Sequence, residues 1–180
     1  MTAKSKWYPI VGGFSSGKTS VVEILESMGY AVVPNASRVL IEANRAKGIP
    51  TEVTRRDEAA FQRLVLKKKL EDEGGIDRNR ITFLDNAVPC SIPYFFLNGI
   101  DPQEALKFCE PNLYVKVFLM EQLPYKHDGV RTETEEFMRK LNGEMRKAYE
   151  ALGYEVIDVP VAPTKEEVVN RVKLILSHVI

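Results

Sequence analysis

Gly12-Gly13-Phe14-Ser15-Ser16-Gly17-Lys18-Thr19 is the stretch that decides the fold of this 180-residue chain. It follows the apolar run Trp7 to Val11, a pattern typical of a buried parallel strand. After it, apolar residues recur at helical spacing as far as Met28, and Gly29 ends the pattern. The sequence therefore predicts a strand, a glycine-rich loop and a helix in direct succession.

The loop has the spacing GxxxxGK[ST], which is the Walker A pattern of P-loop proteins. Its glycines let the backbone curl so that successive N–H groups face one anion, and the positive end of the following helix adds to the attraction. We expect Lys18 to reach the β and γ phosphates of ATP, and the Thr19 hydroxyl to be a ligand of Mg²⁺. The predicted phosphate-binding residues are Gly12, Gly13, Phe14, Ser15, Ser16, Gly17, Lys18, Thr19 and Ser20.

Asp85 follows the predicted strand Ile81 to Leu84, where a Walker B aspartate would stand. The carboxyl end of that strand lies beside the phosphate loop in a parallel sheet, so a second Mg²⁺ ligand fits this position. The alternative is a capping or turn aspartate, which is common after any strand. The presence of the loop favours the metal role.

Predicted strands and helices alternate from one end of the chain to the other, which indicates a doubly wound α/β fold. We expect a parallel sheet covered by helices on both faces. We also expect one domain over residues 1–180, since a chain of this length can bury roughly 70% of its unfolded surface. The predicted strands are 7–11, 31–33, 81–84, 113–119 and 154–159. Helices are expected from Lys18, around Val39, from Thr54 to Gly74, from Asp101, from Phe137 to Leu152, and from Thr164. Thr54, with Asp57 three residues later, is expected to open the helix that ends at Gly74 as a capping pair.

The composition narrows the choice of partners. The chain has 25 basic and 25 acidic residues, so no net field draws it toward nucleic acid or an anionic membrane. No window has the roughly 18 apolar residues that a membrane helix needs, so no membrane insertion is expected. Cys90 and Cys109 lack disulfide or zinc-ligand spacing, and a reducing cytoplasm is the expected location.

Three classes of P-loop protein fit poorly. Asn98 to Asp101 lacks the lysine of the guanine-reading NKxD segment, which argues against a switch GTPase. Asn86 stands where ring-forming and ABC ATPases usually carry a water-activating glutamate, and the LSGGQ signature is absent. Vigorous ATP hydrolysis is therefore not expected.

Six segments occur in the same order as in the predicted-ATPase family often labelled an AAA domain, and the chain resembles that family over nearly its whole length. The segments are VGGFSSGKTS, GYAVVPNASRVLIE, FQRLVLKKKLE, TFLDNAVPCSIPY, DGVRTETEE and LGYEVIDVP. Relatives of this family include the ribosylnicotinamide kinase domain of NadR and the small nucleoside and nucleotide kinases. The resemblance implies strand order 2-3-1-4-5 and an ATP-dependent phosphotransferase that acts on a small, nucleoside-like or nucleotide-like acceptor.

The resemblance also implies roles for residues outside the loop. A lid at 121–132 would carry Arg131 as a clamp on the transferring phosphate, with Lys126 as a weaker candidate. Lys18, Asp85 and Arg131 would then be the catalytic set. Asn35 and Arg38 would face the acceptor.

The chain departs from the family at three positions. Asn35, Asn86 and Cys90 stand where the family typically has a glutamate, an arginine and an aspartate. An asparagine does not accept a proton from an acceptor hydroxyl near neutral pH. Two functions therefore stay open: a phosphotransferase, or a non-catalytic or weakly hydrolytic module whose lid changes when ATP binds.

Several other basic and aromatic residues can be interpreted either as structural residues or as parts of the acceptor site. Arg55, Arg56 and Arg63 could contact the acceptor or lie on a solvated helix face. Residues 94–96 could stack on a ring, although a run of three aromatics is more often core. Lys67 to Lys69 is expected to lie on a solvated helix face. The oligomeric state stays open.

Overall fold

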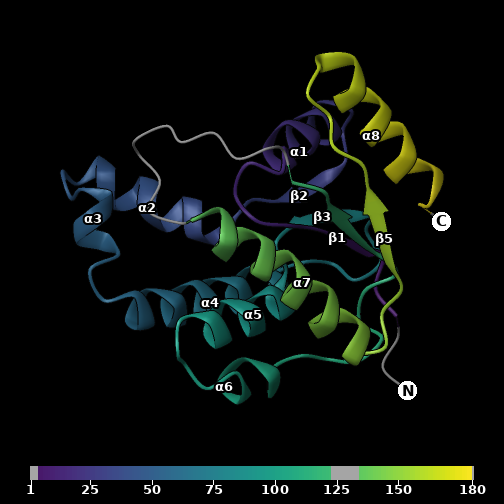
Figure 1. The fold of residues 1–180 in the computed structure, drawn as a ribbon. Coiled ribbons are helices and arrows are strands. Elements are labelled where there is room, and N and C mark those ends of the chain that lie inside the picture. The colour runs from purple at the N-terminus through teal and green to yellow at the C-terminus, as the bar shows by residue number, and fades with distance from the viewer. Residues whose placement is uncertain (1–3, 123–133, 180) are drawn as a thin grey trace.

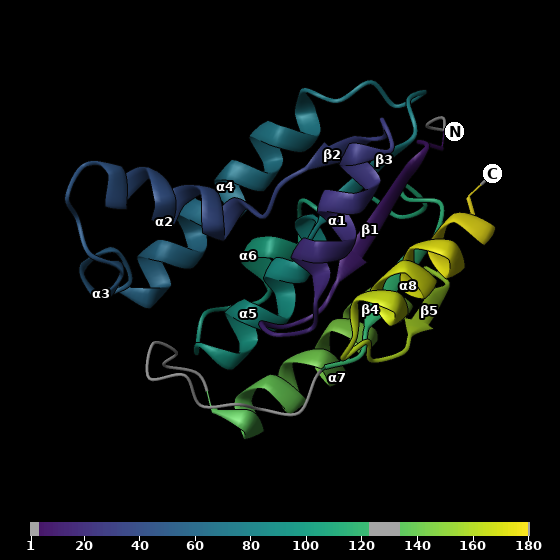
Figure 2. The ribbon, with the colours of Figure 1, turned by 90° about the horizontal axis from the view of Figure 1, so that it is seen from above.

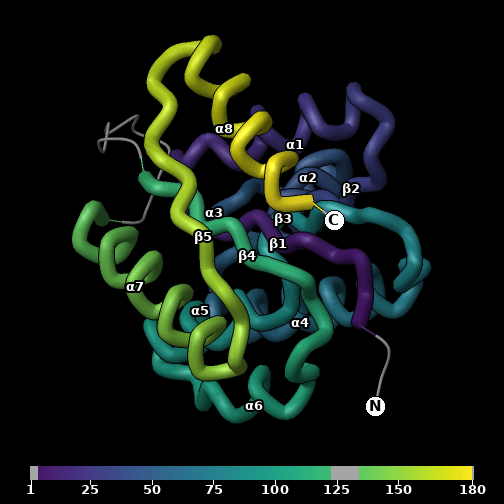
Figure 3. The backbone as a smooth tube through the Cα atoms, turned by 90° about the vertical axis from the view of Figure 1, so that its right-hand side faces the viewer, coloured from purple at the N-terminus to yellow at the C-terminus, as the bar shows by residue number. Residues whose placement is uncertain are grey.

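The computed structural model describes residues 4–122 and 134–179. One five-stranded sheet has the order β2-β3-β1-β4-β5, and every neighbouring pair is parallel. Figure 3 shows the strands side by side between two layers of helices. The expected doubly wound architecture and strand order are confirmed. The strands are β1 (Trp7–Val11), β2 (Ala31–Val33), β3 (Thr82–Asp85), β4 (Val117–Met120) and β5 (Val156–Val159).

The helices cover both faces of the sheet (Figure 1). α1 and α8 lie on one face, and α4, α5 and α7 lie on the other. Figure 1 shows α2 and α3 standing beyond the sheet rather than on either face. The helices of the described residues are α1 (Lys18–Ser27), α2 (Ala36–Ala46), α3 (Thr51–Thr54), α4 (Glu58–Gly74), α5 (Ser91–Leu97), α6 (Gln103–Leu106), α7 (Glu135–Ala151) and α8 (Lys165–Ser177), with a 3₁₀ turn η1 (Val88–Cys90).

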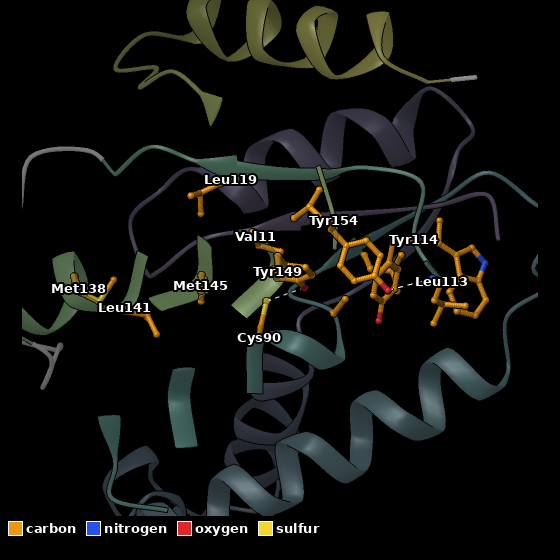
Figure 4. Close-up of a cluster of buried hydrophobic side chains, with 14 residues drawn as sticks. Val11, Cys90, Leu113, Tyr114, Leu119, Met138, Leu141, Met145, Tyr149 and Tyr154 are labelled. Atoms are coloured by element: carbon orange, nitrogen blue, oxygen red, sulfur yellow. Dashed lines mark hydrogen bonds between the residues drawn. The ribbon is translucent and has the colours of Figure 1, made fainter. Parts of the chain in front are cut away.

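Two apolar cores form because successive side chains of a strand point to opposite faces of the sheet. On the face of α1 and α8, Tyr8 and Ile10 of β1 pack with apolar residues of both helices. On the other face, Trp7 and Val11 belong to a core cluster that includes Met145 and Tyr149 of α7. Figure 4 shows Val11 among the side chains of this cluster. β1 is therefore buried on both sides, as its continuous apolar run predicts.

The helices α2, α4, α7 and α8 each begin at a side chain that caps a free backbone N–H group. The predicted capping box of Thr164 and Glu167 opens α8. The expectation that Thr54 opens the long helix α4 is wrong. Asp57 is the cap instead, because its Oδ1 accepts a hydrogen bond from the Ala60 amide at 2.9 Å. Thr54 ends the short helix α3, and its hydroxyl donates back to the Pro50 carbonyl at 3.2 Å.

Two segments differ from the sequence prediction. β4 begins at Val117 rather than at Leu113, whose amide donates to the Tyr154 hydroxyl at 3.1 Å. The proline-rich segment after β3 contains a 3₁₀ turn and the helix α5, which the sequence did not predict. Pro93 is tolerated because it lies in the first turn of α5, where backbone N–H groups lack intrahelical partners in any case.

Within the described ranges, no helix is both long enough and apolar enough to span a bilayer.

Glu73 is a carboxyl group buried near the end of α4. Its Oε1 accepts a hydrogen bond from the Val88 amide at 2.7 Å, and its Oε2 accepts one from the Tyr114 hydroxyl at 2.6 Å. It therefore joins α4 to the turn η1 and to the chain that leads into β4. Burial is the largest influence on this group and raises its pKa to about 7, although the two hydrogen bonds and Lys69 act in the opposite direction.

This raised pKa predicts a pH-dependent stability. The folded chain holds the Glu73 proton more tightly than the unfolded chain does, so this group's contribution is full below pH 4.5 and is lost as the pH rises to about 7. The loss amounts to about 3 kcal/mol at about 1.36 kcal/mol per pKa unit. In Glu73→Gln, urea unfolding across this pH range should lack that decline. Glu71→Gln, an exposed change on the same helix, should keep it, and a full decline in Glu73→Gln would contradict the assignment.

Candidate functional site

The loop between β1 and α1 lies at the carboxyl edge of the sheet, where the ends of β1, β3 and β4 come together (Figure 2). Its glycines are required by geometry. Gly12 has a φ of 152° and a Cβ there would stand 3.2 Å from the Met120 carbonyl oxygen, and Gly17 has a left-handed φ of 77°. The chain therefore curls tightly before α1 begins at Lys18, as the sequence predicts.

The curled loop leaves backbone donors available to an anion. Among the described residues, the N–H groups of Gly17, Lys18 and Thr19 have no hydrogen-bond acceptor. They stand at the start of α1, where the helix dipole is positive. A cavity of about 530 Å³ is lined by residues 14–19 together with Asn35, Arg38 and Asp85. Free amides, a helix start and an adjoining cavity are the requirements of a phosphate site.

Lys18 is buried, and its ammonium group folds back onto the loop. Its Nζ donates to the Gly12 carbonyl at 2.8 Å, to the Gly13 carbonyl at 2.7 Å and to Ser16 Oγ at 3.2 Å. These three bonds use all three donors of the ammonium group. Burial lowers the pKa of Lys18, and the carboxylate of Asp85 partly offsets that effect. Phosphate oxygens would therefore have to replace the carbonyl oxygens around this cation.

Two asparagines hold the first half of the loop. Asn86 Oδ1 accepts from the Gly12 amide at 3.2 Å, and Asn86 Nδ2 donates to the Gly12 carbonyl at 3.4 Å. Asn142 Oδ1, on α7, accepts from the Gly13 amide at 3.0 Å. Asn86 has a left-handed φ of 60°, which asparagine tolerates better than most residues do. The residue that replaces the family's arginine thus fastens the loop to the end of β3.

Arg171 of α8 holds the second half of the loop from the opposite face of the sheet. Its guanidinium donates to the carbonyls of Ser16 and Pro160, and its Nη2 donates to the Glu121 carbonyl at 3.0 Å. The side chain is buried, and burial lowers its pKa. One cation therefore joins the loop to the segments that follow β4 and β5.

Thr19 and Asp85 line the same cavities at the carboxyl edge, which suits a shared Mg²⁺. Asp85 Oδ1 accepts a hydrogen bond from Asn35 Nδ2 at 3.1 Å. Within the described parts of the chain, Asp85 Oδ2 has no hydrogen-bond donor. No group of three or more His, Cys, Asp or Glu side chains forms a metal site there. One carboxylate and one hydroxyl fit an ion that takes its other ligands from water and phosphate.

The predicted acceptor residues lie around the larger cavity. Asn35 caps α2, because its Oδ1 accepts from the Arg38 amide at 3.1 Å. Arg38 lines the cavity with Arg45, and its Nε is 2.7 Å from Glu42 Oε1. This ion pair raises the pKa of Arg38. Ser20 is exposed in the first turn of α1.

Arg131, Lys126 and the lid from residue 123 onward lie outside the described residues. The structure therefore places neither the predicted phosphate clamp nor the lid that would carry it.

A second cavity, of about 40 Å³, adjoins the loop on the side of α4 and α5. Lys69 of α4 lines it and is only 6% exposed, so the expectation of a solvated face for Lys67 to Lys69 is wrong at this residue. Arg55 also lines this cavity and pairs with Glu58 at 3.0 Å. Of the three aromatics, Phe95 is buried in the core and Phe96 is exposed, whereas Tyr94 lines the cavity.

Three residues that fasten the loop were missed as site residues in the sequence. Asn142 and Arg171 belong to helices far along the chain, and neither stands in a recognisable motif. Asn86 stood out only as a departure from the family pattern. A signal existed for Arg171 alone, since it falls in the otherwise apolar stripe of α8 between Val168 and Val172.

The comparison with family models gives one match. Residues 7–167 match the family described as AAA domain, which covers most of the chain. A sequence search of curated proteins gave no match.

Several solved structures share the fold. NadR in complex with NR is 18% identical with a TM-score of 0.61, and 97% of this chain aligns to 52% of that one. The chain thus spans about half the length of NadR. Deoxyadenosine kinase from M. mycoides is 14% identical over 95% of this chain and 96% of that one, with a TM-score of 0.61. Thymidylate kinase from Ehrlichia chaffeensis is 12% identical over 97% and 98%, with a TM-score of 0.65. The chain has the P-loop kinase fold and belongs to the AAA-domain family matched over residues 7–167.

Proposed function

We propose that the chain is an ATP-dependent and Mg²⁺-dependent phosphotransferase that acts on a small acceptor of nucleoside-like or nucleotide-like size. The proposal rests on one observation: free amides of the loop, Lys18, Thr19 and Asp85 meet at one cavity with Asn35 and Arg38. Phosphate-binding groups and candidate acceptor groups thus share a single space. The fold shared with small-molecule kinases supports this reading.

Different residues of the site have different roles in phosphate transfer. The amides at the start of α1 and the ammonium of Lys18 bind phosphate oxygens and stabilise the charge that builds up on them. Thr19 and Asp85 would hold Mg²⁺, which neutralises phosphate charge when it is bound. Asn35 keeps the Asp85 carboxylate oriented by its hydrogen bond. Arg131 would complete the charge balance from the lid.

A second function is favoured by Asn35 and Asn86. Both replace charged residues of the family, and both make structural hydrogen bonds here. A module that binds ATP without transferring its phosphate would keep the loop and Lys18 and lose the acceptor chemistry. Binding and turnover therefore have to be measured separately.

Nucleotide binding is tested by thermal unfolding. At a hundredfold excess over its dissociation constant, Mg·ATP should stabilise the folded chain by about 2.7 kcal/mol, which raises Tm by roughly 5 to 11 °C at this chain length. Lys18→Ala should remove most of the shift. Lys67→Ala, on an exposed face of α4, should keep it. An equal shift in wild type and Lys18→Ala would rule out binding at the loop.

Phosphate transfer is tested by acceptor-dependent ADP release. Asp85→Asn removes a metal-binding charge but keeps a similar shape, and it should lower turnover on the order of 100-fold, since a metal ion contributes several kcal/mol. Excess Mg²⁺ should restore part of the loss. Asp101→Asn, an exposed change that preserves a helix-start acceptor, should leave turnover unchanged. Saturable ATP binding with no acceptor-dependent release would favour the non-catalytic module.

A further inference from the structure

Lys69 carries a buried amino group beside the proposed transfer site; burial lowers its pKa, and the negative groups around it act in the opposite direction. It lies on α4 and lines the cavity of about 40 Å³ together with Gly13, Lys18 and Asn35. A cavity of this size admits a few heavy atoms, which is enough for a carboxylate or phosphate end but not for a whole nucleoside. Among the described residues, no Asp or Glu side chain lines it.

The ammonium group of Lys69 is only partly satisfied by the protein. Its Nζ donates to Ser91 Oγ at 3.2 Å, and it forms no ion pair with any described carboxylate. An ammonium group has three donors, so two remain for a ligand. A buried charge is costly unless it is paired and hydrogen-bonded, which makes this position a poor one for a purely structural lysine.

The nearby acidic groups do not supply the missing partner. Glu73, one helical turn away, is occupied by the Val88 amide and the Tyr114 hydroxyl. Asp85 accepts from Asn35 and acts on Lys18 as well as on Lys69. Burial raises the pKa of the Cys90 thiol, which keeps it neutral. In the part of the chain that the structure describes, Lys69 therefore has no carboxylate in direct contact, although the charges of Glu73 and Asp85 act on it, and its two remaining donors are available to a ligand anion.

Within residues 4–122 and 134–179, no Asp, Glu or His side chain that could take a proton from an alcohol lines the same cavity. Asn35 stands where the family typically has a carboxylate, and both ends of its amide are engaged, by the Arg38 amide and by Asp85. An acceptor oxygen that is already ionised needs no base, because it carries no proton to remove. The amide at Asn35 and the partly satisfied ammonium group of Lys69 thus both favour an acceptor that is already an anion.

Building on the proposed transfer site, we propose that the acceptor is an anion whose charged oxygen, of a phosphate monoester or a carboxylate, is the nucleophile and is bound by Lys69. That oxygen forms a bond to the γ-phosphorus of the nucleoside triphosphate. The bond from this phosphorus to the β-phosphate oxygen breaks, and its electron pair leaves with the diphosphate. The products are a nucleoside diphosphate and a phosphoric anhydride or acyl phosphate, and no proton is transferred.

Binding is measured first, with magnesium and a non-hydrolysable ATP analogue present. Nucleoside 5′-monophosphates, inorganic phosphate and small carboxylates are titrated while Tm is followed, and each monophosphate is paired with its uncharged nucleoside. Anions of at least one class should stabilise the wild type, and their nucleosides should not. Lys69→Met should weaken that anion's binding about 10-fold to 100-fold, the range expected for hydrogen bonds to a charged group. If none of these anions stabilises the wild type, the proposal fails.

A matched variant separates the site from general charge effects. Lys67→Met removes a lysine from the exposed face of the same helix and should leave anion binding unchanged. Lys69→Met should also retain the Tm shift caused by Mg·ATP alone, since the loop and Lys18 are intact. Equal weakening in both variants would overturn the assignment to Lys69.

Turnover assays distinguish the proposal of an anionic acceptor bound by Lys69 from the broader proposal that the chain is a phosphotransferase. ADP release that depends on monophosphates or carboxylates, and that falls in Lys69→Met through a higher KM, supports both. Release with uncharged nucleosides alone supports a transferase and overturns the anionic acceptor. Anion binding that requires Lys69, without release for any acceptor, supports the anion site and counts against the transferase. Comparing the turnover of monophosphates with that of carboxylates identifies which of the two groups is the nucleophile.

Discussion

The site depends on a loop whose backbone must be held in place without using the donors that bind phosphate. The N–H groups of Gly12 and Gly13 are consumed by Asn86 and Asn142, and the Ser16 carbonyl is held by Arg171. The N–H groups of Gly17, Lys18 and Thr19 have no acceptor within the described part of the chain. The division is physical: fixed amides at the start of the loop set its shape, and free amides at its end supply the attraction for an anion.

The three fastening residues come from separate parts of the fold. Asn86 directly follows β3, Asn142 lies on α7 on one face of the sheet, and Arg171 lies on α8 on the other. The loop therefore keeps its shape only when both helical layers are packed. The cores on the two faces also meet at β1, the strand that leads into the loop.

Local patterns in the sequence were enough for the parallel sheet and the glycine loop, and the family resemblance supplied the strand order, but neither contained the contacts between distant elements. The alternation of short apolar runs with helical stripes led to the parallel sheet, and the spacing of Gly12, Gly17 and Lys18 led to the curled loop. The helix α5 was missed because prolines usually interrupt helices, and Lys69 was misplaced because lysine is seldom buried. Both errors come from tertiary packing, which a local pattern does not contain.

The asparagines at positions 35 and 86 change the charges around Asp85, Lys18 and Lys69. A glutamate at position 35 would put a second negative charge against Asp85, whereas the asparagine amide donates to that carboxylate. An arginine at position 86 would add a third cation near Lys18 and Lys69, whereas the asparagine fastens the loop without charge. Together these two changes remove one charge of each sign, whereas Cys90, where the resemblance implies an aspartate, leaves one negative charge fewer beside Lys18 and Lys69. What the exchange alters is the chemistry available to an acceptor, since the Asn35 amide does not accept a proton while the buried lysines remain.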